Sequence, residues 1–221
     1  MKKVLCVFSI VVMSASIMTG CTSIDYREDL KNKTIEAALF IPEIPEPEMD
    51  WVNPVQSAMY DEEVKQAYSQ VDLEKIIIEE FQKYTHENGT RVKVDANEGY
   101  IDNVEIPVNT NFEEEKKSNP RASSYLLNDV SDKIGKKYVF EFKVRGWGHM
   151  GKRVHSYINY TAVLYDVAAN EVVWKKNWYE KEAFPGIMST NGDAEDPENI
   201  VPVLRECVKG SIEYCFEAMN E

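Results

Sequence analysis

The chain is short of the residues that mark several specialised protein classes. Among its 221 residues are 10 glycines and 9 prolines, which excludes collagen-like and Pro/Gly low-complexity chains. No internal repeat is visible, which argues against solenoids and propellers. Apolar residues make up 43% of the chain and charged residues 29%, so disorder throughout is excluded as well. The composition indicates one globular domain, with or without a tail.

Histidine is scarce too, with 3 residues, and no catalytic spacing is present. The sequence has no GxSxG, HExxH, CxxC or P-loop, and no GxGxxG before a helix. His86 lacks the second histidine of a zinc helix, and His149 with His155 gives too few ligands for a structural zinc. The acidic stretch 193–198 lacks EF-hand spacing. We therefore expect no metal site, no cofactor and no enzymatic activity.

A hydrophobic run of the roughly 20 residues that span a bilayer is missing, yet a shorter run opens the chain. Lys2 and Lys3 precede the uncharged, mostly apolar residues 4–17, which is typical of a signal peptide. The run ends in MTGC at 18–21, which resembles the lipobox of bacterial lipoproteins. The alternatives are an ordinary signal peptide or a chance cysteine after an apolar run.

The lipobox resemblance implies cleavage between Gly20 and Cys21. It further implies a diacylglyceryl thioether on Cys21 and acylation of its freed amine, for example with palmitate. Two or more acyl chains give stable anchoring. Thr22 is not the Asp that favours the inner membrane in enteric-type bacteria, so we expect the outer membrane, facing the periplasm. The expected organisation is a removed signal peptide (1–20), a lipidated polar tether (21–33) and one globular domain (34–221).

The mature chain expected from this cleavage is strongly acidic. Loss of Lys2 and Lys3 leaves 23 of the 25 basic residues against 38 acidic ones, a net charge of −15. Such a charge repels nucleic-acid phosphates and anionic lipid head groups. We expect no nucleic-acid partner, and membrane attachment through the lipid rather than through a basic surface.

Hydrophobic periodicity predicts an α/β (α+β) domain with a mixed sheet, a C-terminal antiparallel meander and flanking helices. Strands are expected at 34–41, 90–95, 100–108, 138–145, 154–166 and 171–179. Helices are expected at 60–71, from an Asp72 cap to Asn88, at 123–134 and from about residue 200, with Pro202 in its first turn. The rest is expected to be a proline-rich connection at 42–54, a charged loop at 109–120, a Gly-rich turn at 146–151 and an acidic loop at 185–199.

Cys207 and Cys215 remain once Cys6 leaves with the signal peptide and Cys21 is lipidated. Eight residues apart on one helix, they are separated by about 12 Å along its axis. A disulfide needs Cα atoms within about 7 Å, so the two cannot bridge. We expect both to be small buried apolar residues, and the alternative is an intermolecular disulfide.

The turn at 146–151 is a candidate contact site in an otherwise acidic protein. Trp147, His149, Lys152 and Arg153 are the expected partner-binding residues, because a basic, aromatic loop suits an anionic glycan or an acidic partner. The favoured interpretation is a plain hairpin whose glycines supply positive φ. The many aromatic residues of the meander are expected to be mostly core.

Two segments resemble a group of bacterial envelope lipoproteins. They are IEAALFI at 35–41 and YTAVLYDVAANEVVW at 160–174, although Ala169-Asn170 stands where Thr-Gly is usual. The group includes the curli-secretion lipoprotein, the lipoprotein activators of penicillin-binding proteins and the N-terminal domain of TolB. The resemblance implies an α/β domain that binds envelope proteins without catalysis. The leading hypothesis is a lipid-anchored protein of envelope assembly or maintenance. A ligand-binding lipoprotein that uses loop 146–153 is the alternative, and a hydrolase with a non-standard site is a third.

Overall fold

The structure is a computed structural model that describes residues 23–50, 62, 64–87, 91–102, 104–150, 155–183 and 197–220. The expected signal peptide and Cys21 lie outside these residues, as do the helix stop at 88–89 and the acidic loop up to residue 196. None of the helices among the described residues combines the length and the apolar character that a membrane crossing requires.

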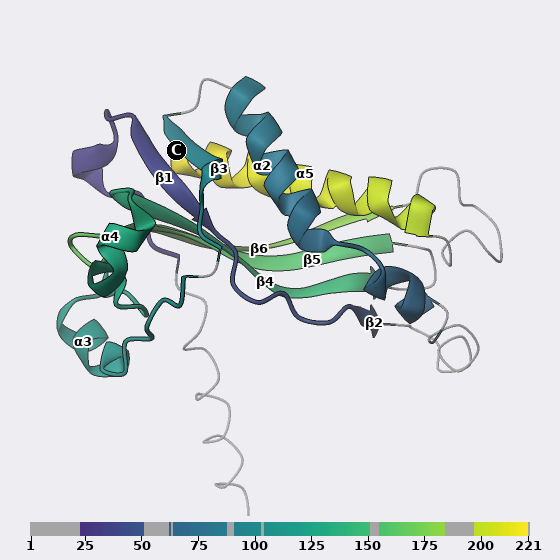
Figure 1. The fold of residues 1–221 in the computed structure, drawn as a ribbon, viewed down its shortest axis with the longest axis horizontal. Coiled ribbons are helices and arrows are strands. Elements are labelled where there is room, and N and C mark those ends of the chain that lie inside the picture. Colours follow the sequence, from purple (N-terminus) through teal and green to yellow (C-terminus); the bar gives the residue numbers. More distant parts are fainter. Residues whose placement is uncertain are drawn as a thin grey trace, which may run out of the picture.

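One six-stranded mixed sheet organises the chain, with the order β3-β1-β4-β5-β6 and β2 paired to β4 (Figure 1). β1 runs parallel to both of its neighbours, whereas β4, β5 and β6 form the expected antiparallel meander. The α/β class and the meander are therefore confirmed. The strands are β1 (Ile35–Phe40), β2 (Glu48–Asp50), β3 (Val92–Tyr100), β4 (Tyr138–Met150), β5 (His155–Asp166) and β6 (Glu171–Ala183).

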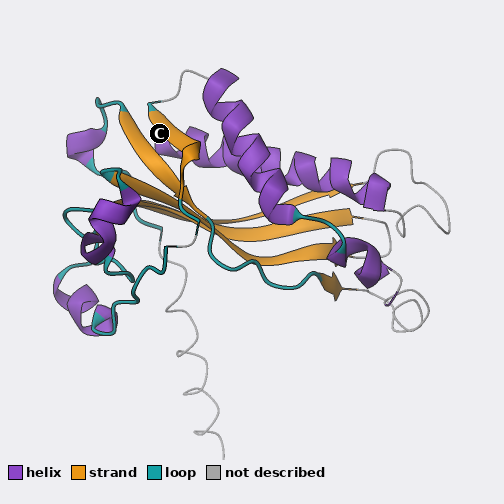
Figure 2. Cartoon of the chain, viewed as in Figure 1, coloured by secondary structure: helices purple, strands orange, loops and turns teal. Residues whose placement is uncertain are grey.

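Two long helices, α2 (Leu73–Glu87) and α5 (Pro197–Asn220), cover one face of the sheet, here called the helix face (Figure 2). The opposite face is called the open face. Residues 101–134 cover one end of the open face through a second apolar cluster that includes Leu127 and Val139. This segment holds the 3-10 helix η2 (Leu127–Val130) and the helices α3 (Phe112–Ser118) and α4 (Ser131–Ile134).

The alternation of β4 explains how one strand serves both faces. Phe140 and Phe142 are fully buried against α2, where Phe81 meets each ring at 5.5 Å. Val139 precedes them in sequence and belongs to the cluster of the open face. Period-two alternation therefore places apolar side chains where each layer needs them.

Helix α2 begins where the sequence predicted. The Oδ1 atom of Asp72 accepts a hydrogen bond from the backbone N–H of Lys75 at 2.9 Å, which is an N-cap. Helix α5 buries the free thiols of Cys207 and Cys215, as expected. It begins at Pro197, so the expectation that Pro202 lies in the first turn is wrong. Pro202 lies inside the helix, where it removes one backbone donor.

One connection differs from expectation, whereas the turn at 167–170 forms as expected. The charged stretch 109–120 contains the helix α3, whose acidic first turn and basic last turn match the helix dipole. The turn after β5 carries Asn170 at φ 53°, a left-handed conformation that asparagine tolerates. Asn170 thus adopts there the backbone conformation that the usual glycine of the resembled group favours.

The N-terminal segment expected to be a tether packs on the domain from Ile24 onward. Ile24 and Lys175 exchange backbone hydrogen bonds of 3.0 and 2.9 Å, which adds a bridge to β6. Arg27 reaches Asp166 at 3.0 Å, and Leu30, in the 3-10 helix η1 (Glu28–Leu30), is buried. The folded unit therefore begins ten residues before the expected boundary at 34.

Candidate interaction surfaces

The expected Gly-rich loop is the end of a strand. β4 continues to Met150, paired with β5 on one side and with β2 on the other. Trp147 is 3% exposed and donates its Nε1–H to the carbonyl oxygen of Pro45 at 2.7 Å, and His149 is fully buried. The expectation of an exposed contact loop at 146–150 is therefore wrong, because the proline-rich connection and β2 cover this strand end.

Gly148 shows what the glycines do there. It has φ 140°, and a Cβ on it would overlap the backbone oxygen of Glu48 and lie 2.8 Å from the Glu48 nitrogen. The glycine therefore permits the close approach of β2 rather than a flexible hairpin. Of the other expected contact residues, Lys152 and Arg153 lie outside the described residues, and so does the side chain of His155. Within the described part of the chain, no group of three or more His, Cys, Asp or Glu is placed to hold a metal ion.

The aromatic residues of the meander are mostly core, as expected. Trp174 and Tyr160 are fully buried beneath the helices, and Tyr165 is buried on the open face. Trp178 is 39% exposed and stacks on Tyr214 of α5 at 3.9 Å. This pair joins β6 to α5 at the rim of the helix face.

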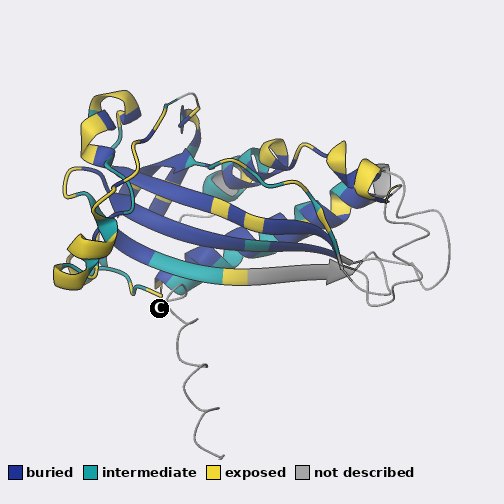
Figure 3. Cartoon of the chain, turned by 90° about the horizontal axis from the view of Figure 1, so that it is seen from below, coloured by how far each residue is buried: buried dark blue, intermediate teal, exposed yellow. Residues whose placement is uncertain are grey.

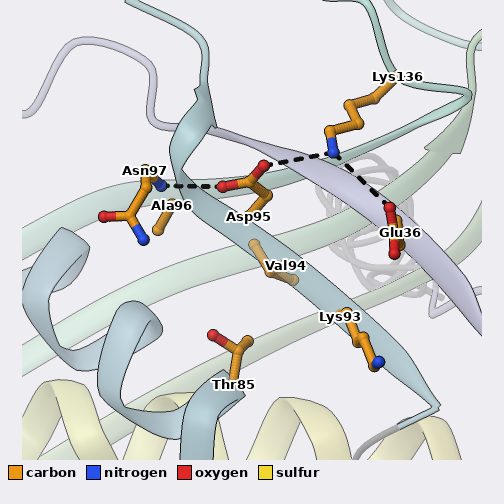
Figure 4. Close-up of a pocket in the computed structure, with 8 residues that line it drawn as sticks. All are labelled: Glu36, Thr85, Lys93, Val94, Asp95, Ala96, Asn97 and Lys136. Atoms are coloured by element: carbon orange, nitrogen blue, oxygen red, sulfur yellow. Dashed lines mark hydrogen bonds and ion pairs between the residues drawn. The ribbon is translucent and has the colours of Figure 1, made fainter.

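A groove of about 370 Å³ wraps the outer strand β3 (Figure 4). Lys136 lies 3.3 Å from Asp95 and 3.7 Å from Glu36, and all three side chains gather on one side of the strand. Burial raises the pKa of Asp95, but hydrogen bonds from the backbone of Gly99 and Asn97 and from Lys136 outweigh it, so the pKa is lowered. The groove is lined by Glu36, Thr85, Lys93, Val94, Asp95, Ala96, Asn97 and Lys136. Paired charges of both signs suit a polar peptide better than an apolar ligand.

A buried carboxyl lies where β4 meets the segment 101–134. Glu141 is 3% exposed and accepts hydrogen bonds from the hydroxyls of Tyr125, at 2.8 Å, and Tyr165, at 2.9 Å. Burial raises the pKa of Glu141, although both tyrosine hydroxyls and the charges of Lys143 and Lys175 act in the opposite direction. The alternation of the sequence predicts a solvent-facing position for Glu141. Its burial depends on Tyr125, whose position no local pattern reveals.

Figure 3 views the sheet from the open face, where the strands are mostly buried and only short stretches are exposed. Lys143, Thr161 and Asn177 form one cross-strand row, and the Thr161 hydroxyl donates to Oδ1 of Asn177 at 2.7 Å. Lys143 and Arg145 are exposed, the latter at a bulge in β4. Lys175 on β6 is half-buried and lies in the adjacent cross-strand row, which also contains Val163 and Glu141. The charge of this surface is opposite in sign to that of the whole chain.

No protein-family model matches the sequence, and no curated protein matches it. Among solved structures, the PelC dodecamer from Paraburkholderia phytofirmans is 10% identical with a TM-score of 0.32, over 85% of this chain and 93% of that chain. The hypothetical protein CT253 from Chlamydia trachomatis is 10% identical with a TM-score of 0.35, over 80% and 97%. The lipoprotein GNA1162 from Neisseria meningitidis is 12% identical with a TM-score of 0.27, over 80% and 99%. Likeness at this level carries no argument about function.

Proposed function

We propose that this chain is a bacterial lipoprotein, anchored through Cys21 in the outer membrane and facing the periplasm, that acts by binding envelope proteins rather than by catalysis. The observation that carries the proposal is the order of a basic start, an apolar run and the Thr-Gly-Cys box, with a folded body that begins three residues after the cysteine. The lipid holds the body at one surface and so raises its effective concentration for partners there.

The groove along β3 is the surface that we assign to the partner. β3 ends the strand order of the sheet, and no other described strand pairs with its outer side. The backbone groups on an outer strand edge can bind an extended peptide as an additional strand. Lys93, which is exposed, and the pair Asp95–Lys136 would give such contact its polar specificity.

The alternative function, a ligand-binding lipoprotein, is less well supported because part of its expected site is buried. It depended on an exposed loop at 146–153, but Trp147 and His149 are buried within the fold. The groove beside β3 is lined chiefly by charged and polar side chains, without the aromatic walls of a small-molecule pocket. Contact with proteins is therefore the function that the described surfaces favour.

Crosslinking in intact cells tests the partner surface. A photo-reactive residue in place of Lys93 is expected to capture a reproducible envelope neighbour, because it lies in the groove. The same residue in place of Glu113, exposed on α3, is the matched control and is expected to capture none. Equal capture at both positions, or no reproducible neighbour from Lys93, would overturn the assignment.

A further inference from the structure

The connection between Cys21 and the folded body is very short. Ile24 is already held to β6 by two backbone hydrogen bonds with Lys175. Only Thr22 and Ser23 lie between Ile24 and Cys21, and an extended chain covers about 3.4 Å per residue, or about 10 Å in all. A body anchored at Cys21 must therefore lie against the membrane surface.

The open face of the sheet is the side nearest to this anchor. The side chain of Ile24 packs against the apolar cluster of the open face. The uncovered part of that face carries Lys143, Arg145 and Lys175, on strands of the meander. Anchor and basic residues thus share one side of the molecule.

Acidic side chains also lie near this surface, because Glu36 on β1 and Glu48 on β2 are both exposed. Glu36 pairs with Lys136 at 3.7 Å, and Glu48 accepts the hydroxyl of Tyr157 at 2.7 Å. Glu141 is buried and accepts hydrogen bonds from two tyrosine hydroxyls. The exposed charges of β4 are therefore basic, whereas α5, on the far side of the body, exposes the acidic Glu206 and Glu217.

We propose that the open face docks on the anionic phospholipid head groups of the membrane that holds the anchor, with Lys143 and Arg145 as the main phosphate contacts. This inference rests on the proposed anchoring at Cys21. Basic side chains are attracted to an anionic surface within a Debye length of about 8–10 Å, a range that the short connection enforces. The net charge of −15 repels the body as a whole from an anionic surface, so the side that carries Lys143 and Arg145 is the one that can approach the head groups.

The test uses the full lipidated protein, reconstituted into phosphatidylcholine vesicles with or without phosphatidylglycerol. A thiol-reactive fluorophore is attached at Asn159→Cys on the open face, and a quencher is carried on the lipid head groups. The native thiols are poor competitors for the label, because Cys207 is buried and burial raises the pKa of Cys215 to about 12. The matched control carries the fluorophore at Lys83→Cys, which is exposed on α2.

With phosphatidylglycerol present, the Asn159 probe is expected to lose most of its emission. The Lys83 probe is expected to keep its emission, because it lies on the far side of a helix about 10 Å thick. Reversal of charge by Lys143→Glu with Arg145→Glu is expected to abolish the loss at Asn159. The pair Lys75→Glu with Lys83→Glu, which makes the same charge change on α2, is expected to leave it unchanged. Lys143→Gln with Arg145→Gln replaces the reversal pair if circular dichroism shows that pair to be unfolded.

The outcomes distinguish a failure of the proposed docking from a failure of the proposed anchoring at Cys21. If the protein does not float with the vesicles, the proposed anchoring at Cys21 is wrong, and the proposed docking is wrong as well. A protein that floats but is quenched equally at both positions overturns the docked orientation alone. Quenching at Asn159 that is the same without phosphatidylglycerol overturns the role of anionic lipid. Protection of Asn159 that grows with protein density would assign the face to a second copy of the chain instead.

Discussion

The carboxyl group of Glu141 couples the stability of the domain to pH. Burial raises its pKa above the ordinary value of 4.5, so the folded state binds this proton more tightly than the unfolded state. The contribution of Glu141 to stability therefore falls as pH rises from the unfolded pKa through the raised folded pKa, and is level above it. We expect the free energy of unfolding of the wild type, relative to Glu141→Gln, to fall over this window.

Urea unfolding at a series of pH values measures this difference. Glu113→Gln, on the exposed surface of α3, reports the effect of removing a solvated carboxylate and is the control. A wild-type minus Glu141→Gln difference that stays flat or rises across the window would contradict a raised pKa for the buried Glu141 carboxyl.

Gly148 is the position where a single methyl group should cost most. With φ 140° and the backbone of Glu48 where the new Cβ would stand, Gly148→Ala must displace β2 or strain the backbone. We expect a loss of about 2–4 kcal/mol in the free energy of unfolding, measured by urea denaturation. Gly146→Ala is the matched control, since its Cβ would meet only the flexible end of Glu48 at 3.4 Å, and it should cost under about 1 kcal/mol. Equal losses in the free energy of unfolding for the two variants would show that β2 moves aside at little cost and would contradict the prediction.

At the scale of elements, one arginine joins the two helices of the helix face. Arg205 of α5 pairs with Glu80 of α2 at 2.6 Å and with Glu79 at 2.7 Å, and the Glu80 side chain is only 5% exposed. Arg205→Ala leaves that carboxylate buried without its cation, so we expect a loss of about 1–3 kcal/mol. Glu79→Ala breaks only the exposed partner and should cost under about 1 kcal/mol. Chemical denaturation measures the free energy of unfolding of both variants. A larger loss for Glu79→Ala than for Arg205→Ala would refute the prediction.

The elements that the sequence predicted well are those with local signals. Alternation at 138–144, the Asp72 cap and the stripe of the C-terminal helix each lie within one stretch of chain and report one face of one element. The insertion of β1 between β3 and β4 has no such signal. Parallel pairing joins strands that are far apart in the chain, and their register depends on packing between layers.

The candidate site was harder to predict for the same reason. Glycines at 146 and 148 resemble a flexible turn, but Gly148 is set by the approach of Glu48, one hundred residues earlier. The polar segment 22–33 resembles a tether, but Ile24 pairs with Lys175, far along the chain. In both places, contact with a segment far away in the sequence determines whether the residues are buried. The composition of a short stretch of sequence does not reveal such a contact.

For the whole molecule, the anchor has a direct chemical test. Mass spectrometry of the native protein is expected to show acyl mass on the wild type and none on Cys21→Ala, because only that thiol would form the thioether. Cys207→Ala is the control and should keep the acyl mass, since its thiol is buried in α5. A wild-type protein that retains its initiator methionine and leader would refute the anchor.

The bridge between Ile24 and Lys175 also decides how the body responds to mechanical load. A pull on Cys21 reaches the domain first through the two hydrogen bonds of this bridge. The hydrogen bond from Arg121 to the carbonyl oxygen of Asp25 and the ion pair of Arg27 with Asp166 follow along the chain. If Cys21 carries the proposed lipid and the segment detaches as far as residue 34, the reach of the connecting chain grows from about 10 Å to about 44 Å. The backbone bridge at the edge of β6 would then set the largest distance between the domain and the bilayer.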